Sequence, residues 1–306
     1  MCKCKINEKI DLDWQEIVNI LGLNVSGDHL RKTAYGLVEY DNYLNSPGAI
    51  ITTILSISDT HVPFQLPVST FCDYQGVDIL QINGDIVDAQ AISKFQKQYR
   101  ISPMEEMIKG RSYLIELINY IKPKKVFVNW GNHDIRFANY LAKNLDSDVL
   151  ELMPNTSVEL IVQDGFTHYD KLNGTKSHYE PLIDVFADSG IEIKFVDDYK
   201  YKIGKTWFVH PSAYKSGILA TCDKAKSYFD DVDCGGFDCV VCAHTHKIAD
   251  SKKGRVRLIE QGACCYVDKM LYSAGRLNAP QQMGFAGICQ NENGELVQDR
   301  TKVVII

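Results

Sequence analysis

Apolar residues recur at helical spacing in the first part of the chain. The pattern within residues 12–22 predicts an amphipathic helix that carries Trp14, Ile17, Val18 and Leu21. Gly22 and Asn24 end this pattern, and Ser26 is a suitable N-cap for a second helix. The second helix carries Leu30, Ala34, Leu37 and Tyr40 at related positions. Two helices joined by a short turn are the pattern of a helix-turn-helix.

The second of these helices begins with a small group of cationic or titratable side chains. In a DNA-binding helix-turn-helix, His29, Arg31 and Lys32 would face the major groove. The alternative is a helical hairpin that only packs on the main domain, and we favour it because the segment contains more acid than base. Residues 45–48, Asn-Ser-Pro-Gly, have the composition of a linker. The sequence therefore predicts a helical leader over residues 1–48 and a second domain over residues 49–306.

From about residue 50 the apolar residues occur in short continuous runs that are typical of buried strands. The predicted strands are residues 51–58, 77–83, 125–130, 191–196, 202–209, 237–242 and 256–259. Helices are predicted at residues 104–121 and 135–145, and residues 146–190 are ambiguous, with a helical insertion as one interpretation. The early strands alternate with helices and the later ones follow one another closely. This order predicts an α/β fold with a parallel or mixed sheet, which could be a sandwich of two sheets.

Composition and charge exclude some classes of protein. A formal net charge of -6 argues against a large non-specific DNA-binding surface, which needs many Lys and Arg residues. No apolar run is long enough to span a membrane, and the N-terminus does not resemble a secretory signal. The ten cysteines are scattered, so we expect reduced thiols in a cytoplasmic protein. Cys239 and Cys242 have the spacing of a redox or zinc pair, but we interpret them as strand side chains.

Side chains suited to metal binding follow five of the predicted strands. They are Asp59 and His61, then Asp85, then Asn132 and His133, then His210, and finally His244 and His246. Open α/β sheets place their sites at the carboxyl ends of strands, so these residues are expected to converge. Imidazole, carboxylate and amide ligands without thiolate favour Mn²⁺, with Fe, Zn²⁺ and Ni²⁺ as alternatives. Asp85 could bridge two cations about 3.5–4 Å apart, a spacing that suits attack on a phosphoryl group.

The order of these motifs resembles that of the calcineurin-like metallophosphoesterase family. The motifs are Asp-x-His, Gly-Asp-x-x-Asp, Gly-Asn-His-Asp, a single His and then His-x-His, over roughly residues 50–262. The resemblance implies a β-sandwich flanked by helices and a centre with two metal ions. It assigns one metal to Asp59, His61, Asp85 and His246, and the other to Asp85, Asn132, His210 and His244. It also implies that His133 stabilises charge or protonates the leaving oxygen, with Asp134 orienting His133.

Two positions depart from the usual family pattern. Ala243 stands where the family usually has Gly, and Pro211 follows His210 where Gly is frequent, which makes His210 the least secure ligand. Asp88 could belong to the metal site, but we favour a helix cap for it. Arg136 could bind a substrate phosphate or be a surface charge.

Three further segments have candidate roles. His168 and His178 are interpreted as surface residues of a loop. Residues 94–113 mix basic and aromatic side chains, which suits single-stranded nucleic acid, although a solvated helix face is the preferred interpretation. A polar loop over residues 275–285 could border the metal site.

These observations predict a metal-dependent phosphoric ester hydrolase. The first hypothesis is a phosphodiesterase or nuclease that acts on nucleic acid, based on the leader and on the basic and aromatic segment. The leader and core also resemble phage- or prophage-type members of the family. The alternative is a phosphomonoesterase acting on a phosphoprotein or nucleotide, and a third hypothesis is a non-catalytic binding module. The expected partner is a phosphate ester, with DNA as one candidate, and no membrane.

Overall fold

The computed structural model describes residues 12–44, 52–93, 101–151, 153, 156–270 and 280–306. For residues 36–44 it describes the backbone alone. The chain forms two compact units, Met1–Ile51 and Thr52–Ile306. The domain boundary expected after residue 48 falls outside the described residues. Each unit is described by itself below.

The N-terminal unit is a helical hairpin of α2 (Trp14–Ile20) and α3 (Gly27–Leu44), as predicted. Asp13 begins α2 because its side chain accepts a hydrogen bond from the Glu16 backbone N–H at 2.7 Å. At the start of α3, the Ser26 hydroxyl accepts one from the His29 backbone N–H at 3.2 Å. The helices pack through buried apolar side chains, namely Ile17, Val18 and Ala34.

The second unit contains two large sheets, which face each other, and a two-stranded sheet described below. The first has the order β13 (Lys302–Ile305), β12 (Gly284–Gln290), β1 (Thr52–Ile57), β2 (Ile79–Asn83), β3 (Lys125–Asn129) and β6 (Glu192–Val196). The second has the order β10 (Ile248–Lys253), β11 (Val256–Gln261), β9 (Cys239–Cys242), β8 (Thr206–Val209) and β7 (Lys200–Ile203). Strands β1, β2, β3 and β6 are parallel, as are β8, β9 and β11. Parallel strands bring their carboxyl ends to one edge, and this edge carries the site.

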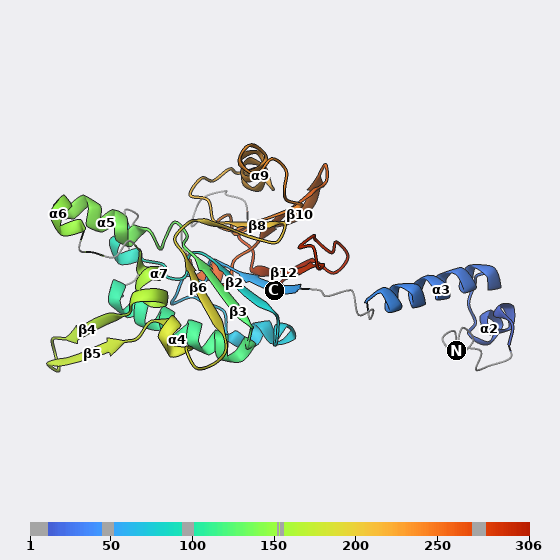
Figure 1. The fold of residues 1–306 in the computed structure, drawn as a ribbon, viewed down its shortest axis with the longest axis horizontal. Helices are drawn as coiled ribbons and strands as arrows, with labels where there is room; N and C mark the ends of the chain where they lie inside the picture. Colours follow the sequence, from blue (N-terminus) through green and yellow to red (C-terminus); the bar gives the residue numbers. More distant parts are fainter. Residues whose placement is uncertain (1–11, 45–51, 94–100, 152, 154–155, 271–279) are drawn as a thin grey trace. The chain divides into compact units, whose positions relative to one another are not determined.

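One core fills the space between the sheets and two others lie under helices. Ile54, Ile79 and Phe127 of the first sheet share a buried cluster with Phe208, Val241 and Ile259 of the second. Because side chains alternate along a strand, Leu80 points to the opposite face and packs with Leu117 of α4 (Pro103–Ile121). Helix α9 (Ala220–Val232) covers the outer face of the second sheet, as Figure 1 shows. The fold is therefore the predicted β-sandwich flanked by helices.

Several connections differ from the prediction. The expected strand over residues 202–209 is a hairpin of β7 and β8, because Gly204 turns the chain with φ +54°. The ambiguous segment 146–190 contains short helices α6 (Ser147–Leu150), α7 (Ser157–Glu159) and α8 (Leu182–Val185), with a π-helix at Leu160–Asp164. It also contains a hairpin of β4 (Phe166–Asp170) and β5 (Thr175–Tyr179), which sequence inspection interpreted as a loop. The expected polar loop 275–285 ends inside β12, where Phe285 is buried.

The remaining helical elements connect these strands. They are α5 (Arg136–Asn144) and 3-10 turns at Val68–Tyr74, Gln90–Ile92 and Val267–Lys269. No helix among the described residues has the length and apolarity needed to cross a membrane. All eight cysteines in the described part of the chain are free thiols, and Cys239 and Cys242 are buried in β9 as expected.

Candidate metal centre

The site residues lie in tight turns directly after the strands. Asp59 and His61 follow β1, Asp85 follows β2, and His244 and His246 follow β9. All five adopt positive φ values, 52°, 41°, 54°, 72° and 51° in that order, which L-residues rarely adopt. Strained backbone of this kind persists where the surrounding structure fixes it, and it is concentrated at functional sites.

Two glycines allow these turns to approach each other. A Cβ atom on Gly84 would lie 2.6 Å from Nδ1 of His210 and 2.7 Å from the Gly131 backbone. A Cβ atom on Gly131 would meet the carboxylate of Asp85. The Gly-Asp and Gly-Asn-His-Asp motifs therefore need glycine at both positions so that Asp85 can reach the centre.

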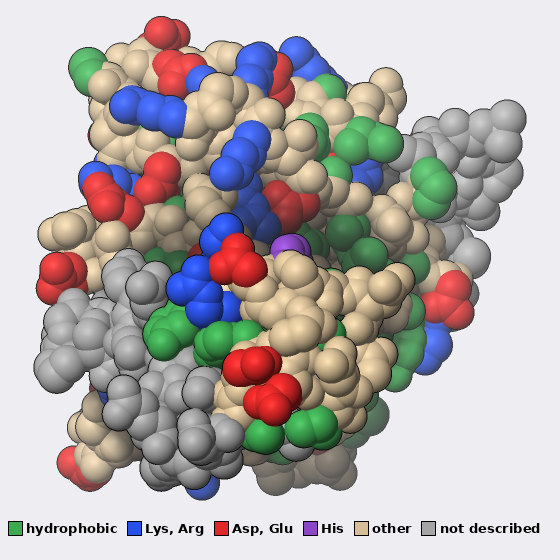
Figure 2. All heavy atoms as spheres, turned by 90° about the vertical axis from the view of Figure 1, so that its right-hand side faces the viewer, with side chains coloured by type: hydrophobic (Ala, Val, Ile, Leu, Met, Phe, Trp, Pro, Cys, Tyr) green, Lys and Arg blue, Asp and Glu red, His purple; other side chains and the backbone are tan. Residues whose placement is uncertain are grey.

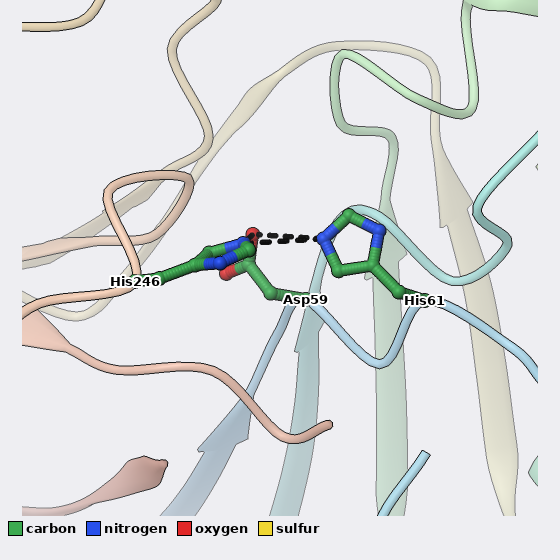
Figure 3. Close-up of side chains that lie close together, drawn as sticks. All are labelled: Asp59, His61 and His246. Atoms are coloured by element: carbon green, nitrogen blue, oxygen red, sulfur yellow. Dashed lines mark hydrogen bonds and ion pairs between the residues drawn. The ribbon is translucent and has the colours of Figure 1, made fainter. Parts of the chain in front are cut away.

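The first cluster consists of Asp59, His61 and His246. Figure 3 shows the two imidazole rings directed at the carboxylate. Nε2 of His246 lies 3.1 Å from Oδ1 of Asp59 and 3.2 Å from Nε2 of His61. The side chains of all three residues are buried. Three electron-pair donors thus converge on one small volume.

The second cluster consists of Asp85, His210 and His244, with Asn132 beside it. Nε2 of His210 lies 3.2 Å from Oδ2 of Asp85 and 3.3 Å from Oδ1 of Asn132. Nδ1 of His210 lies 2.7 Å from the Asn83 carbonyl oxygen, which orients the ring. The structure therefore places His210 in the centre, although Pro211 follows it.

Asp85 lies between the two clusters. Its Oδ2 is 3.2 Å from Nε2 of His210 in one cluster and 3.8 Å from Nε2 of His61 in the other. Its Oδ1 accepts the backbone N–H of His133 at 2.7 Å, which fixes the orientation of the carboxylate. This is the position that a carboxylate bridging two cations would occupy.

The donor set fits divalent cations. In the first cluster, the Nε2 atoms of His61 and His246 lie close to each other, and Nε2 of His246 is also close to a carboxylate oxygen of Asp59. A proton on either nitrogen can form a hydrogen bond with only one of these neighbours. Nδ1 of His246 is buried without a hydrogen-bond partner among the described residues, so nothing there fixes the tautomer. A cation would accept all three lone pairs at once, and imidazole with carboxylate is a donor set for Mn²⁺, Fe or Zn²⁺.

The raised pKa values of two histidines link metal binding to the release of protons. Burial alone would lower the pKa of His61, but hydrogen bonds to Asp59 and Asp88 outweigh burial and raise it to about 9. Burial is likewise outweighed at His210, where Asp85 and Asp59 raise the pKa to about 10. At neutral pH both rings therefore carry a proton that a cation must displace. Metal affinity should consequently increase as the pH rises from neutral toward these values.

The other ligand groups are already in the form that binds metal. Burial would raise the pKa of Asp59 and Asp85, but the surrounding imidazoles lower both values well below the usual range. Burial and the charge of His210 lower the pKa of His244 to about 3, so this ring is neutral. The cluster thus offers anionic carboxylates and a neutral imidazole at neutral pH.

His133 lies at the edge of the two clusters and is held by Asp88. Nδ1 of His133 is 3.1 Å from Oδ1 of Asp88 and 2.8 Å from its carbonyl oxygen. Nε2 of His133 is 3.9 Å from Oδ2 of Asp85, so this end of the ring faces the centre. Burial is the main cause that lowers the pKa of His133. Asp88 is fully buried and its second contact is Nδ1 of His61 at 3.4 Å, so the interpretation of Asp88 as a helix cap is wrong.

The carboxylate of Asp134 binds backbone N–H groups instead of orienting His133, the role that was predicted for it. Its carboxylate accepts the backbone N–H groups of Asp85, Ile86 and Gly131 at 2.7, 3.1 and 2.8 Å. Burial and the charge of Asp85 raise the pKa of Asp134 to about 7. Asp134 thus fixes the turn that presents Asp85, and Asp88 provides the carboxylate next to His133.

Arg136 is half-buried at the start of α5 and contacts the same group. Its Nη1 donates to the Asp88 carbonyl oxygen at 2.8 Å, and its Nη2 lies 2.8 Å from Nε2 of His133. The guanidinium is therefore directed toward the centre and is not an isolated surface charge.

Sequence inspection missed a set of buried amides beneath the site. The side chain of Gln81 donates to Asn129 at 2.6 Å, Asn129 donates to Asn83 at 3.0 Å, and Asn83 donates to the Val209 carbonyl oxygen at 3.3 Å. This chain of hydrogen bonds joins β2 and β3 to the end of β8, which carries His210. Polar residues inside otherwise apolar strand runs were the available signal, because buried amides need partners.

The other candidate residues lie elsewhere. His168 and His178 are in the β4–β5 hairpin, where His178 is exposed. Lys109 pairs with Glu105, Tyr113 is buried in the core, and residues 94–100 lie outside the described part. Gln282 does border the centre, because its backbone N–H donates to the His246 carbonyl oxygen at 2.7 Å.

Comparison with known proteins agrees with this geometry. The family model for calcineurin-like phosphoesterases matches residues 52–248, and the chain belongs to that family. Membership of this metallophosphoesterase family points to a hydrolase. The family typically binds two divalent metal ions, and the two clusters described above are the candidate sites for them.

The chain is also similar to solved structures. An archaeal phosphodiesterase is 14% identical, with 83% of this chain and 99% of that chain covered and a TM-score of 0.37. Vacuolar protein sorting 29 from Cryptosporidium parvum is 14% identical, with coverages of 84% and 97% and a TM-score of 0.38. A predicted phosphoesterase from Streptococcus pneumoniae is 11% identical, with coverages of 84% and 98% and a TM-score of 0.29. A search of curated protein sequences found no match.

Proposed function

We propose that this protein is a metal-dependent phosphodiesterase that uses two Mn²⁺ ions and hydrolyses phosphodiester bonds in nucleic acid. The observation that carries the proposal is the place of Asp85, whose Oδ2 approaches a histidine of each cluster at 3.2 and 3.8 Å. Asp59, His61, Asp85 and His246 would hold one ion, and Asp85, Asn132, His210 and His244 the other. Two bound cations supply an activated water and neutralise the charge of the phosphoryl group.

In this proposal His133 moves the proton of the reaction. Asp88 holds Nδ1 of His133, and Nε2 faces the centre, where it accepts from Nη2 of Arg136 at 2.8 Å. When the Arg136 guanidinium contacts a substrate phosphate instead, Nε2 is released to take a proton and give it to the leaving oxygen, which otherwise departs as an unstable alkoxide. Arg136 lies beside Nε2 at 2.8 Å and is placed to contact a phosphate oxygen with its guanidinium.

The cationic side chains near the centre support a diester as the substrate. A diester carries one negative charge, whereas a monoester carries up to about two at neutral pH. Lys247 directly follows a metal-ligand candidate, but its Nζ donates to the carbonyl oxygens of Lys215, Ser216 and Gly217 at 2.9, 3.0 and 3.1 Å. Arg136 is thus the cation placed for the phosphate, and one guanidinium suits a singly charged group.

A small-substrate comparison tests this proposal. With Mn²⁺ present, we expect bis-p-nitrophenyl phosphate to be hydrolysed with a kcat/KM at least about tenfold above that of p-nitrophenyl phosphate, a difference of about 1.4 kcal/mol. Release of p-nitrophenol measures both reactions. The reverse preference would support a phosphomonoesterase acting on a phosphoprotein or nucleotide. Absence of turnover of both compounds with Mn²⁺, Fe, Zn²⁺ and Ni²⁺ would support a non-catalytic binding module.

We also propose that the N-terminal hairpin engages DNA. Arg31 and Lys32 pair with Asp28 at 2.7 and 2.8 Å, and all three side chains are largely exposed. Exposed ion pairs are weak, so these cations can exchange a carboxylate for a phosphate. Figure 2 shows Lys and Arg interspersed with Asp and Glu among the described side chains of the face it draws.

Deletion of residues 1–48 should weaken DNA binding and leave the turnover of small diesters unchanged. Fluorescence anisotropy with a labelled duplex and p-nitrophenol release measure the two effects. The matched variant is Arg31→Ala with Lys32→Ala, which keeps the hairpin. It should make the slope of log binding constant against log salt concentration shallower by the contribution of about two phosphate contacts. Loss of small-diester turnover on deletion would show instead that the hairpin is a structural part of the catalytic unit.

The free thiols also support a cytoplasmic location for this activity. All eight cysteines in the described part of the chain are unpaired with one another, and reduced thiols persist in a reducing compartment.

A further inference from the structure

A pocket of about 340 Å³ lies beside the metal centre at the end of β8. Val209 and Pro211 line this pocket, and the residue between them is the metal-ligand candidate His210. Because side chains alternate along a strand, Val209 packs on the α9 side with Phe229 while His210 is directed to the other side, toward the metal centre. The other wall is formed by α9 through Lys224, Tyr228 and Phe229. Val209 and Pro211 place the pocket at the carboxyl end of β8, the edge of the second sheet that carries the site.

The lining combines an apolar floor with aromatic rings and cations. Val209 and Phe229 are buried and form the floor, while Tyr199 and Tyr228 stand at the rim. Nζ of Lys200 lies 4.5 Å from the ring centre of Tyr199 and 6.0 Å from that of Tyr228, so one cation holds both rings. Burial raises the pKa of Tyr199, and a side-chain hydrogen bond with Tyr228 contributes to the rise. Tyr199 and Tyr228 are thus linked by this hydrogen bond and share one cation.

Lys224 supplies a cation at the same pocket. On the same helix Lys226 pairs with Asp230, whereas Lys224 is exposed and has no carboxylate partner among the described residues. An available cation beside aromatic rings suits a ligand that is both planar and anionic. Nucleic acid strands are bound in this way, with bases stacked on aromatic side chains and phosphates near cations.

We propose that this pocket binds one nucleobase of the substrate strand, stacked on Tyr228, while Lys224 contacts the adjoining phosphate. The inference rests on the proposed function, because it gives the pocket a role in the same reaction. The volume lies at the small end of the range for ligand sites, which suits a single base better than a longer segment. The neighbouring phosphodiester would then reach the centre at His210. Tyr228 is in this view a specificity-determining residue.

The test compares thymidine dinucleotides that differ only in their bases. Hydrolysis by the Mn²⁺-loaded protein is measured by chromatography for the intact dinucleotide, for the two singly abasic forms and for the doubly abasic form. For the wild-type protein, removal of one particular base should lower kcat/KM by about 10- to 100-fold, the effect of one stacked base. Tyr228→Ala should lower kcat/KM for the intact dinucleotide by a similar factor. This variant should hydrolyse the intact dinucleotide and the form that lacks that particular base with the same kcat/KM. The doubly abasic compound should be hydrolysed equally by both proteins.

Two further variants test whether the effect of Tyr228→Ala comes from loss of the aromatic ring at this position. Tyr228→Phe keeps the ring and should retain the preference for the base. Tyr169→Ala removes a tyrosine of similar exposure, 56% against 46% for Tyr228, from the distant β4–β5 hairpin and should behave as wild type. If the dinucleotide is hydrolysed but Tyr228→Ala keeps the wild-type preference, the inference is overturned and the proposed function stands. If bis-p-nitrophenyl phosphate is hydrolysed but the dinucleotide is not, the inference is overturned and only the phosphodiesterase part of the proposed function stands. If neither compound is hydrolysed, the proposed function fails as well.

Discussion

Asp85→Asn is expected to reduce the bound metal from two ions to one and to lower phosphodiester hydrolysis by about 1,000-fold or more. The asparagine Oδ1 can still accept the His133 backbone N–H, which Asp85 accepts at 2.7 Å, so the turn should persist. The amide nitrogen would then replace Oδ2 and direct N–H groups at His61 and His210, which lie 3.8 and 3.2 Å away. Plasma mass spectrometry of the loaded protein and p-nitrophenol release measure the two effects.

The control for this substitution is Asp188→Asn. Asp188 is exposed and lies far from the centre in sequence, between α8 and β6. This variant removes the same charge and should keep both ions and full activity. Retention of two tightly bound ions by Asp85→Asn would show that Asp85 does not bridge them, and the assignment of both clusters would have to change.

His133→Ala should keep both metal ions and lose activity by about 100- to 10,000-fold, the usual contribution of a general acid. The His133 backbone N–H that supports Asp85 remains in this variant. The loss should depend on the leaving group. Expulsion of p-nitrophenol needs little protonation, whereas a sugar alkoxide needs a proton, so the loss should be larger for a dinucleotide than for bis-p-nitrophenyl phosphate.

The matched control is His178→Ala, which removes an exposed histidine of the β4–β5 hairpin. It should retain wild-type rates on both substrates. Equal losses on good and poor leaving groups in His133→Ala would indicate that His133 stabilises charge without transferring a proton. Full activity of that variant would contradict any catalytic role of His133.

The parallel strands of the core could be predicted because burial on both faces leaves continuous apolar runs. β1, β2, β3, β6, β9 and β11 lie within their predicted ranges or extend them by a few residues. Strands β10 and β12 were missed for opposite reasons. β10 carries exposed polar residues, and β12 begins Gly-Phe-Ala-Gly, whose small residues resemble a loop although the strand is buried. The turn at Gly204 was missed because the predicted run took in only the last two residues of β7 together with the apolar strand β8.

The convergence of the site residues was also predictable, since the strand ends of a parallel sheet share one edge. The roles of Asp88 and Asp134 were not, because they depend on contacts between loops. Val62 after β1 forms backbone hydrogen bonds with the loop after β2, donating to Ile86 at 2.9 Å and accepting from Asp88 at 3.2 Å. This pairing draws Asp88 under His133, and no local pattern in the sequence encodes it.

The number of metal ions held by each chain is the most direct measurement. The wild-type protein would be loaded with Mn²⁺, freed of excess ion by gel filtration and analysed by plasma mass spectrometry against protein concentration. Convergence of two imidazole and carboxylate clusters on Asp85 predicts two ions per chain, and their spin coupling should be visible by electron paramagnetic resonance. A value of one ion or fewer at saturating Mn²⁺, Fe or Zn²⁺ would contradict a dinuclear centre.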